Sequence, residues 1–156
     1  MAKDAIEILM DDHRSAKDAF DRIMKADVDE KEELFEQLVT DLKAHVQLEK
    51  EVFYPRITQK IGNDEIRAFL EGQREEETGG TRLLEELVEM GVGDAAFDAK
   101  FRAFRDTVLK HAVEQEEKGL FPIVKQKMTG PDLQELGRAM ERRQQELRRQ
   151  LEAQAR

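Results

Sequence analysis

Residues 34–55 read LFEQLVTDLKAHVQLEKEVFYP, and the spacing of their apolar positions indicates the fold class. A single stripe recurs every three or four residues and comprises Leu34, Leu38, Leu42, His45, Glu49 and Val52. This spacing is typical of one face of an amphipathic α-helix. Pro55 lacks a backbone donor and restricts the residue before it, so we expect the helix to end there.

Similar stripes predict helices on both sides of this segment. The additional helices are expected over residues 4–25, 64–90 and 97–122, with a short fifth helix over about 131–150. The connections are short, so consecutive helices should run antiparallel. The sequence therefore predicts an all-α fold, an up-down-up-down four-helix bundle in one domain over residues 1–156, with its core at about 4–122. The first turns of the fifth helix should dock, and its end should fray.

The composition narrows the function classes. Charged and hydrophobic residues each make up 39% of the 156 residues, a balance typical of long amphipathic helices. The net charge of −9 disfavours nucleic acid and anionic membranes as partners. The chain has no cysteine, so any metal would be held by nitrogen and oxygen. With no leader pattern and no apolar run of about 18 residues, we expect a cytoplasmic protein.

The only three histidines of the chain all fall on apolar stripes. They are His13, His45 and His111, each on a different predicted helix. If a stripe takes about 30% of helical positions, chance would place all three there on the order of 3% of the time. A buried imidazole costs free energy unless it has a partner. The histidines are therefore candidate ligands of a site inside the bundle.

Carboxylates and an amide lie on the same interior faces. Glu49 follows His45 by four residues, so both side chains project into the bundle from one face. Gln73 and Glu77 occupy interior positions of the third helix where leucine is expected. A pair of divalent cations bound by imidazoles and carboxylates would compensate these buried groups. Structural roles stay open: a histidine bonded to a carbonyl, a glutamate reaching the rim, or a glutamine bridging helices.

Three segments together carry a resemblance to a known family. They are Asp12-His13, His45 to Glu49 followed by Phe53-Tyr54-Pro55, and His111 through Glu116 to Leu120-Phe121-Pro122. This ordered set resembles the bacterial hemerythrin-like (HHE cation-binding) family over about residues 6–140. The resemblance implies a metal site with the ligands His13, His45, Glu49, Glu77, His111 and Glu116. Glu49 and Glu116 are the expected bridges between two metals.

The chain departs from the family pattern at two positions. Glu77 stands where the family usually supplies a histidine, and we interpret it as a carboxylate substitute. In the fourth helix, Glu116 follows His111 by five residues, a step of about 140° in a regular α-helix. A π-bulge between them would bring both side chains to one side. Gln115, four residues after His111, is the second candidate for this ligand position.

The resemblance implies two iron ions as cofactor, bridged by oxo, hydroxo or carboxylate groups, with manganese as the alternative metal. Dioxygen or a peroxide-like molecule is the expected ligand, and the state is expected to be monomer or homodimer. Three carboxylates favour oxidised metal, which points to oxygen or peroxide reduction, as in a di-iron oxidase, or to iron handling. The alternative is a metal-free structural or protein-interaction bundle. Tyr54 is left outside the site as a packing residue, and the Gly79-Gly80 pair either leaves space for a ligand or lets helices approach closely.

Overall fold

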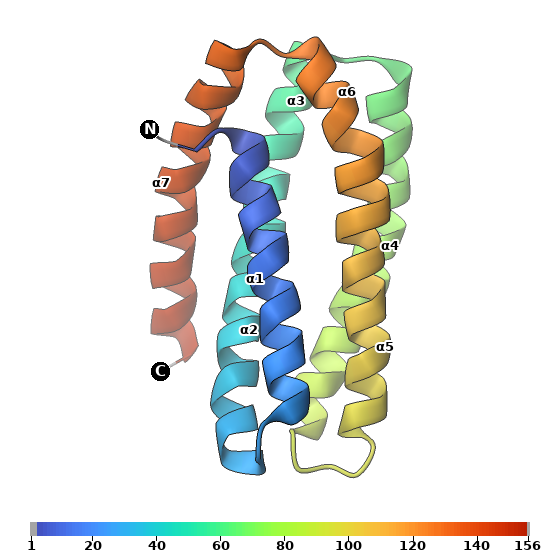
Figure 1. The fold of residues 1–156 in the computed structure, drawn as a ribbon, viewed down its shortest axis with the longest axis vertical. Helices are drawn as coiled ribbons and strands as arrows, with labels where there is room; N and C mark the ends of the chain where they lie inside the picture. Colours follow the sequence, from blue (N-terminus) through green and yellow to red (C-terminus); the bar gives the residue numbers. More distant parts are fainter. Residues whose placement is uncertain (1–2, 156) are drawn as a thin grey trace.

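A computed structural model describes residues 3–155, which form five long helical rods without a β-strand among them. Figure 1 shows four rods running side by side along the long axis, with the fifth against one side. Their segments in chain order are α1 (Ala5–Lys25); α2 (Val28–Leu48), η1 (Glu49–Phe53) and α3 (Tyr54–Lys60); α4 (Asp64–Met90); α5 (Phe97–Lys110), η2 (His111–Leu120) and α6 (Phe121–Lys127); and α7 (Gly130–Ala155). The predicted all-α bundle with a fifth helix is confirmed.

Capping side chains and one glycine set the helix ends. Asp4 caps α1 in a reciprocal pair with Glu7, and Asn63 accepts a hydrogen bond from the first turn of α4. Such side chains satisfy backbone donors that have no partner within the helix. Gly91 ends α4 with a φ of +82°, a conformation that side-chain-bearing residues rarely adopt. These ends give the short connections that keep neighbouring rods antiparallel.

The prediction that helices end at Pro55 and Pro122 is wrong. The second rod continues through α3 to Lys60, and the fourth continues through α6 to Lys127. Each proline follows a π-helical segment, η1 or η2, and lies in the first turn of the α-helix that comes next. Proline is tolerated there, because the donors of a first turn have no α-helical partner to lose.

The apolar core has two parts with a polar region between them. One part lies at the end of the bundle where α1 begins and includes Leu9, Leu48 and Phe121. The other lies towards the opposite end and includes Phe20 and Phe101. Four of the five buried polar side chains of the described residues, His13, Glu49, Gln73 and Glu116, lie on the segments between the two. Two separately packed clusters thus hold the rods on either side of a polar layer.

The fifth helix, α7, packs against α1 and α2. Leu136, Met140 and Leu147 are almost fully buried in this contact. Gly137 allows a close approach, because a Cβ there would lie 2.9 Å from the Asp4 backbone. α7 runs from Gly130 to Ala155, beyond the predicted end at about residue 150, and the fraying of its end stays a prediction.

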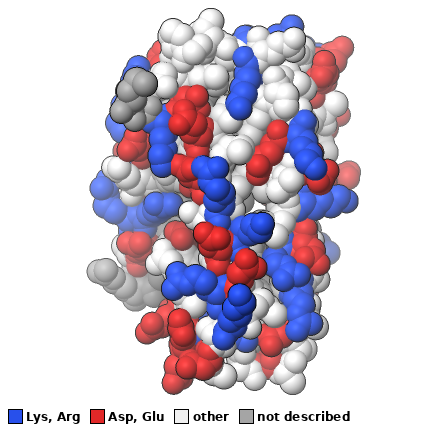
Figure 2. Space-filling view, viewed as in Figure 1, with Lys and Arg blue, Asp and Glu red and all other residues white. Residues whose placement is uncertain are grey.

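The surface is strongly charged in both signs. Figure 2 shows basic and acidic side chains interspersed over one face of the molecule, without a large area of one sign. Within residues 3–155 no helix is both long enough and apolar enough to cross a membrane.

Candidate metal centre

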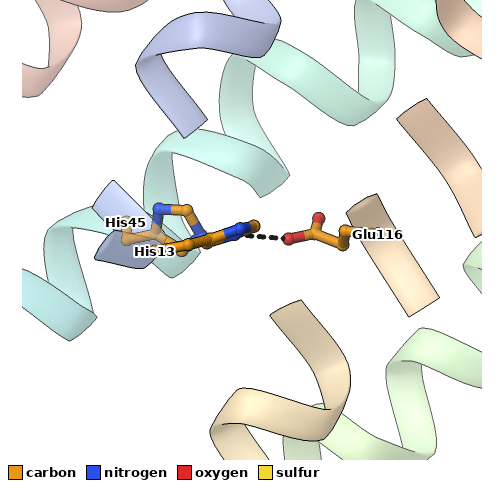
Figure 3. A group of neighbouring side chains, drawn as sticks. All are labelled: His13, His45 and Glu116. Carbon is orange, nitrogen blue, oxygen red and sulfur yellow. Dashed lines mark hydrogen bonds and ion pairs between the residues drawn. The ribbon is translucent and has the colours of Figure 1, made fainter. Parts of the chain in front are cut away.

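Four of the five rods bring polar side chains to one place in the bundle interior. Two groups of three residues have potential ligand atoms within 4.8 Å of one another. The first group is His13, His45 and Glu116, shown in Figure 3, and the second is Glu49, His111 and Glu116. Glu116 belongs to both groups. Five of the six predicted site residues therefore meet in two adjoining clusters that share one carboxylate.

Each of the three imidazoles is held from outside the cluster through its Nδ1 atom. All three contacts are 2.9 Å long and join His13 to Glu117, His45 to Asp12, and His111 to Gln115. An acceptor at Nδ1 favours the tautomer that carries the proton there. Histidines that bind metals usually donate their second nitrogen to such a partner.

The Nε2 atoms face the carboxylates of Glu116 and Glu49. His13 Nε2 lies 3.0 Å from Glu116 Oε1, drawn as the dashed line in Figure 3, and His111 Nε2 lies 3.6 Å from the same oxygen. His45 Nε2 lies 3.4 Å from Glu49 Oε1. Three imidazoles from three rods thus present the same ring nitrogen to one interior region.

Glu116 is fully buried at the centre of this arrangement. Tyr54 donates its hydroxyl hydrogen to Glu116 Oε2 over 2.9 Å. Burial, together with the nearby charge of Glu49, raises the pKa of Glu116 from 4.5 to about 7. Burial and the two carboxylates also raise the pKa of Tyr54 well above its usual value. The phenol therefore keeps its proton and remains a donor to the shared carboxylate.

Glu49 and His45 form the charged pair of the second rod. Burial alone would raise the pKa of Glu49, but His45 and neighbouring hydrogen bonds lower it. Burial alone would lower the pKa of His45, but Glu49 and Asp12 raise it well above its usual value. Glu49 Oε2 and Gln73 Oε1 are buried without a hydrogen-bond partner. Buried polar atoms rarely remain unpaired, so two acceptors here have capacity for a further ligand.

Glu77 lies at the edge of the cluster, and neither group of three includes it. Its side chain is 15% exposed, and its Oε1 lies 2.5 Å from Lys50 Nζ in an ion pair. The structure therefore brings Glu77 to the rim of the site, against a lysine, and its role as a ligand stays a prediction.

In the π-helical segment η2, the neighbouring residues Glu116 and Gln115 point in different directions. Hydrogen bonds that span five residues, such as Phe121 N–H to Glu116 O, widen this turn. His111 and Glu116 consequently face the same cluster, as the expected π-bulge requires. Gln115 instead accepts from the outer nitrogen of His111 and donates to Glu76. Of the two candidates, Glu116 is the one that enters the interior.

Four residues that support the site were not among the predicted site residues, and Tyr54 was predicted only to pack. Tyr54 contacts Glu116, Glu117 holds His13, and Asp12 holds His45. Gln144 of α7 donates to Asp12 Oδ2 over 2.8 Å, so the fifth helix also reaches the site. Only Asp12 carried a local signal, as the neighbour of His13. The other partners lie far away along the chain, and periodicity within one helix does not reveal them.

Two comparisons with known proteins concern the fold and the sequence of this chain. The chain resembles a crystal structure of a hemerythrin HHE cation-binding-domain protein from Mycobacterium kansasii, with a TM-score of 0.80 over 94% of this chain and 88% of that one. At 23% identity this likeness shows the fold. A protein from Nostoc sp. named DNA nickase is 28% identical over 124 residues, which are 79% of this chain and 34% of that protein. This chain thus corresponds to about a third of the Nostoc protein.

The third comparison concerns the family itself. The family model of the hemerythrin HHE cation-binding domain matches residues 4–124. The match includes α1 to η2 and therefore all three histidines and both buried glutamates. It ends before α7, which supplies Gln144. The chain belongs to the hemerythrin HHE cation-binding domain family.

Proposed function

We propose that this chain is a non-haem di-iron protein that binds or reduces dioxygen or peroxide-type small ligands. The observation that carries the proposal is the shared position of Glu116 between two groups of ligand atoms. A carboxylate has two oxygens and can serve two cations at once, as in other bundle sites built from histidine and glutamate. The unpaired Glu49 Oε2 supports the same reading, because a cation would occupy its free acceptor capacity.

The residues divide into two proposed ligand sets around Glu116. His13 and His45 would hold one iron, and Glu49 and His111 would hold the other. Glu77 is proposed as an additional ligand, because its buried Oε1 is compensated in this structure only by an ion pair with Lys50. Imidazole and carboxylate donors suit iron, and they also suit manganese.

Bound iron would supply the redox equivalents and open coordination positions that small oxidants need. The surrounding residues prepare the site for this chemistry. Asp12, Glu117 and Gln115 hold the imidazoles so that Nε2 remains directed inward. The Tyr54 hydroxyl group, whose oxygen lies 2.9 Å from Glu116 Oε2, keeps a proton within reach of the cluster. Several carboxylates offset positive charge, which favours reduction of the ligand over its reversible binding.

Metal content tests the proposal directly. The protein is loaded with ferrous iron without oxygen, desalted and analysed for metal, and its absorption spectrum is recorded before and after air is admitted. We expect about two irons per chain and new near-ultraviolet absorption in air. The variant Glu116→Gln should lose at least one iron. Glu114→Gln is the matched control, since Glu114 lies in the same π-helical segment but is exposed and paired with Lys118.

The outcomes separate the alternatives. Retention of manganese instead of iron under competition would replace the proposed metal and leave the ligand set intact. Absence of any retained metal would mean that the polar cluster is structural, as in a metal-free interaction bundle. Clean recovery of the ferrous protein over repeated cycles of air and vacuum would favour oxygen carriage over reduction.

A nickase activity is not proposed for this chain. This chain aligns with 34% of that protein, so activity of the whole protein can reside elsewhere in it. The net charge of −9 also opposes binding to a phosphate backbone.

A further inference from the structure

The bundle core is underfilled directly beside the His/Glu cluster. One helical turn from the cluster, the interior stripes place one residue from each of four rods at a similar height. These residues are Ala16, Leu42, Gly80 and Val108, and all four line the same cavity. One further turn along, the corresponding positions include the large side chains of Phe20, Leu38, Leu84 and Phe104, which are buried. A layer that holds a glycine and an alanine therefore lies between a polar cluster and a closely packed apolar layer.

Gly80 does not serve close helix packing. A Cβ at Gly80 or at Gly79 would have no heavy atom of another segment within 4 Å. Gly80 nevertheless stands on the interior stripe of α4, between Glu77 and Leu84. Glycine inside a helix costs about 0.5–1 kcal/mol relative to alanine. Of the two roles expected from the sequence, the structure supports open space over close approach.

The resulting cavity is large and has an apolar part and a polar end. Its volume is about 1210 Å³, whereas ligand pockets usually have roughly 300–1,000 Å³. Leu38, Leu84 and Phe104 line one part, and His13, His45 and Glu49 line the other. A water molecule takes about 30 Å³ in the liquid, and dioxygen is of similar size, so small oxidants alone would leave most of the space unfilled. Exposed residues such as Lys43, Val88 and Glu89 also line the cavity, so it opens to solvent and a molecule can enter it.

The charges around the cavity restrict its occupant. The lining includes eight carboxylate residues but only four lysines and arginines. Two of the four cations are already paired, Lys50 with Glu77 and Arg148 with Asp41. In the metal-free protein an anionic molecule would therefore be repelled, and any charged group would lose hydration against the apolar part. An uncharged occupant meets both conditions.

We propose that this cavity binds an uncharged, mainly apolar organic molecule larger than dioxygen, with one end against the His/Glu cluster. The lining of Leu, Val and Phe side chains supplies affinity, and the cluster meets the more polar end. Binding requires no metal, so the inference stands or fails separately from the proposed di-iron function. In an iron-loaded protein, the same geometry would place the organic molecule beside the metal ligands.

Fluorescence of the uncharged probe N-phenyl-1-naphthylamine tests the proposal on the 156-residue chain, before and after loading with iron. We expect saturable enhancement with one probe per chain and displacement by decan-1-ol. The variant Gly80→Leu fills the open layer and should weaken probe binding about tenfold or more. Gly72→Leu is the control, because Gly72 lies in the same helix, has equally open surroundings and does not line the cavity. It should bind the probe like the unchanged protein.

Thermal unfolding of both variants verifies that they fold. We expect both to fold, because leucine is a better helix former than glycine at either position. Three results would overturn the proposal. The first is no saturable probe binding, and the second is equal affinity in the Gly80→Leu and Gly72→Leu variants. The third is stronger displacement by decanoate or decylamine than by decan-1-ol, which would contradict the uncharged class.

Discussion

Replacing Glu116 by glutamine should stabilise the metal-free protein while weakening metal binding. Glutamine has the same shape, and its amide oxygen can still accept the hydrogen bond from Tyr54. What disappears is a buried negative charge next to Glu49. We therefore expect the Glu116 carboxylate to destabilise the metal-free fold. A bound cation would offset this destabilisation.

The magnitude follows from the pKa of Glu116, which is raised from 4.5 to about 7. At about 1.4 kcal/mol per pKa unit, the ionised side chain costs the folded state on the order of 3 kcal/mol above pH 7. Because the folded state holds this proton more tightly, the stability of the unchanged protein falls as pH rises from 4.5 through 7. At pH 5 the side chain is largely protonated, and the two proteins should have similar stability.

Urea unfolding of the metal-free proteins at pH 5 and pH 8 measures this difference. At pH 8 the Glu116→Gln variant should be more stable by up to about 3 kcal/mol, and at pH 5 the gap should nearly vanish. The exposed Glu114→Gln variant should show neither effect. An equal gap at both pH values, or a less stable variant at pH 8, would refute the reasoning that Glu116 carries an uncompensated charge. Unchanged iron content in the variant would refute its role as a bridge.

Three further substitutions test the supporting contacts. Asp12→Asn should weaken iron binding about 10-fold or more in a chelator competition, because it loosens the outer hold on His45; unchanged affinity would contradict this role. Tyr54→Phe leaves one buried oxygen of Glu116 without its donor and should destabilise the fold by about 1–3 kcal/mol in urea unfolding, whereas a neutral result would mean that water replaces the phenol. Gly137→Ala should lower the melting temperature by forcing α7 away from the start of α1, at a cost of about 1–3 kcal/mol. An unchanged melting temperature would show that this contact can relax.

Local pattern was sufficient to predict the five helical rods and to place five of the six predicted site residues on interior faces. A three- and four-residue period belongs to one face of one helix, so the stripes containing His13, His45 and His111 could be read without knowledge of the partners. The five-residue step from His111 to Glu116 likewise predicted a π-helical turn, because no regular α-helix aligns these two positions. The prediction that helices end at Pro55 and Pro122 was wrong for a related reason. The effect of these prolines depends on the hydrogen-bond pattern of the preceding turn, and the π-helical segments change that pattern.

Tertiary structure alone decided which atoms meet across the bundle. Tyr54 reaches Glu116 from a position 62 residues away, and Gln144 reaches Asp12 from 132 residues away. Helical periodicity says which way a side chain points, but not what stands opposite, because that depends on the rotation and height of each rod. For the same reason, the sequence did not reveal the role of Gly80. Its place on an interior stripe was visible in the sequence, but only the separation of the neighbouring rods distinguished an open cavity from a close helix contact.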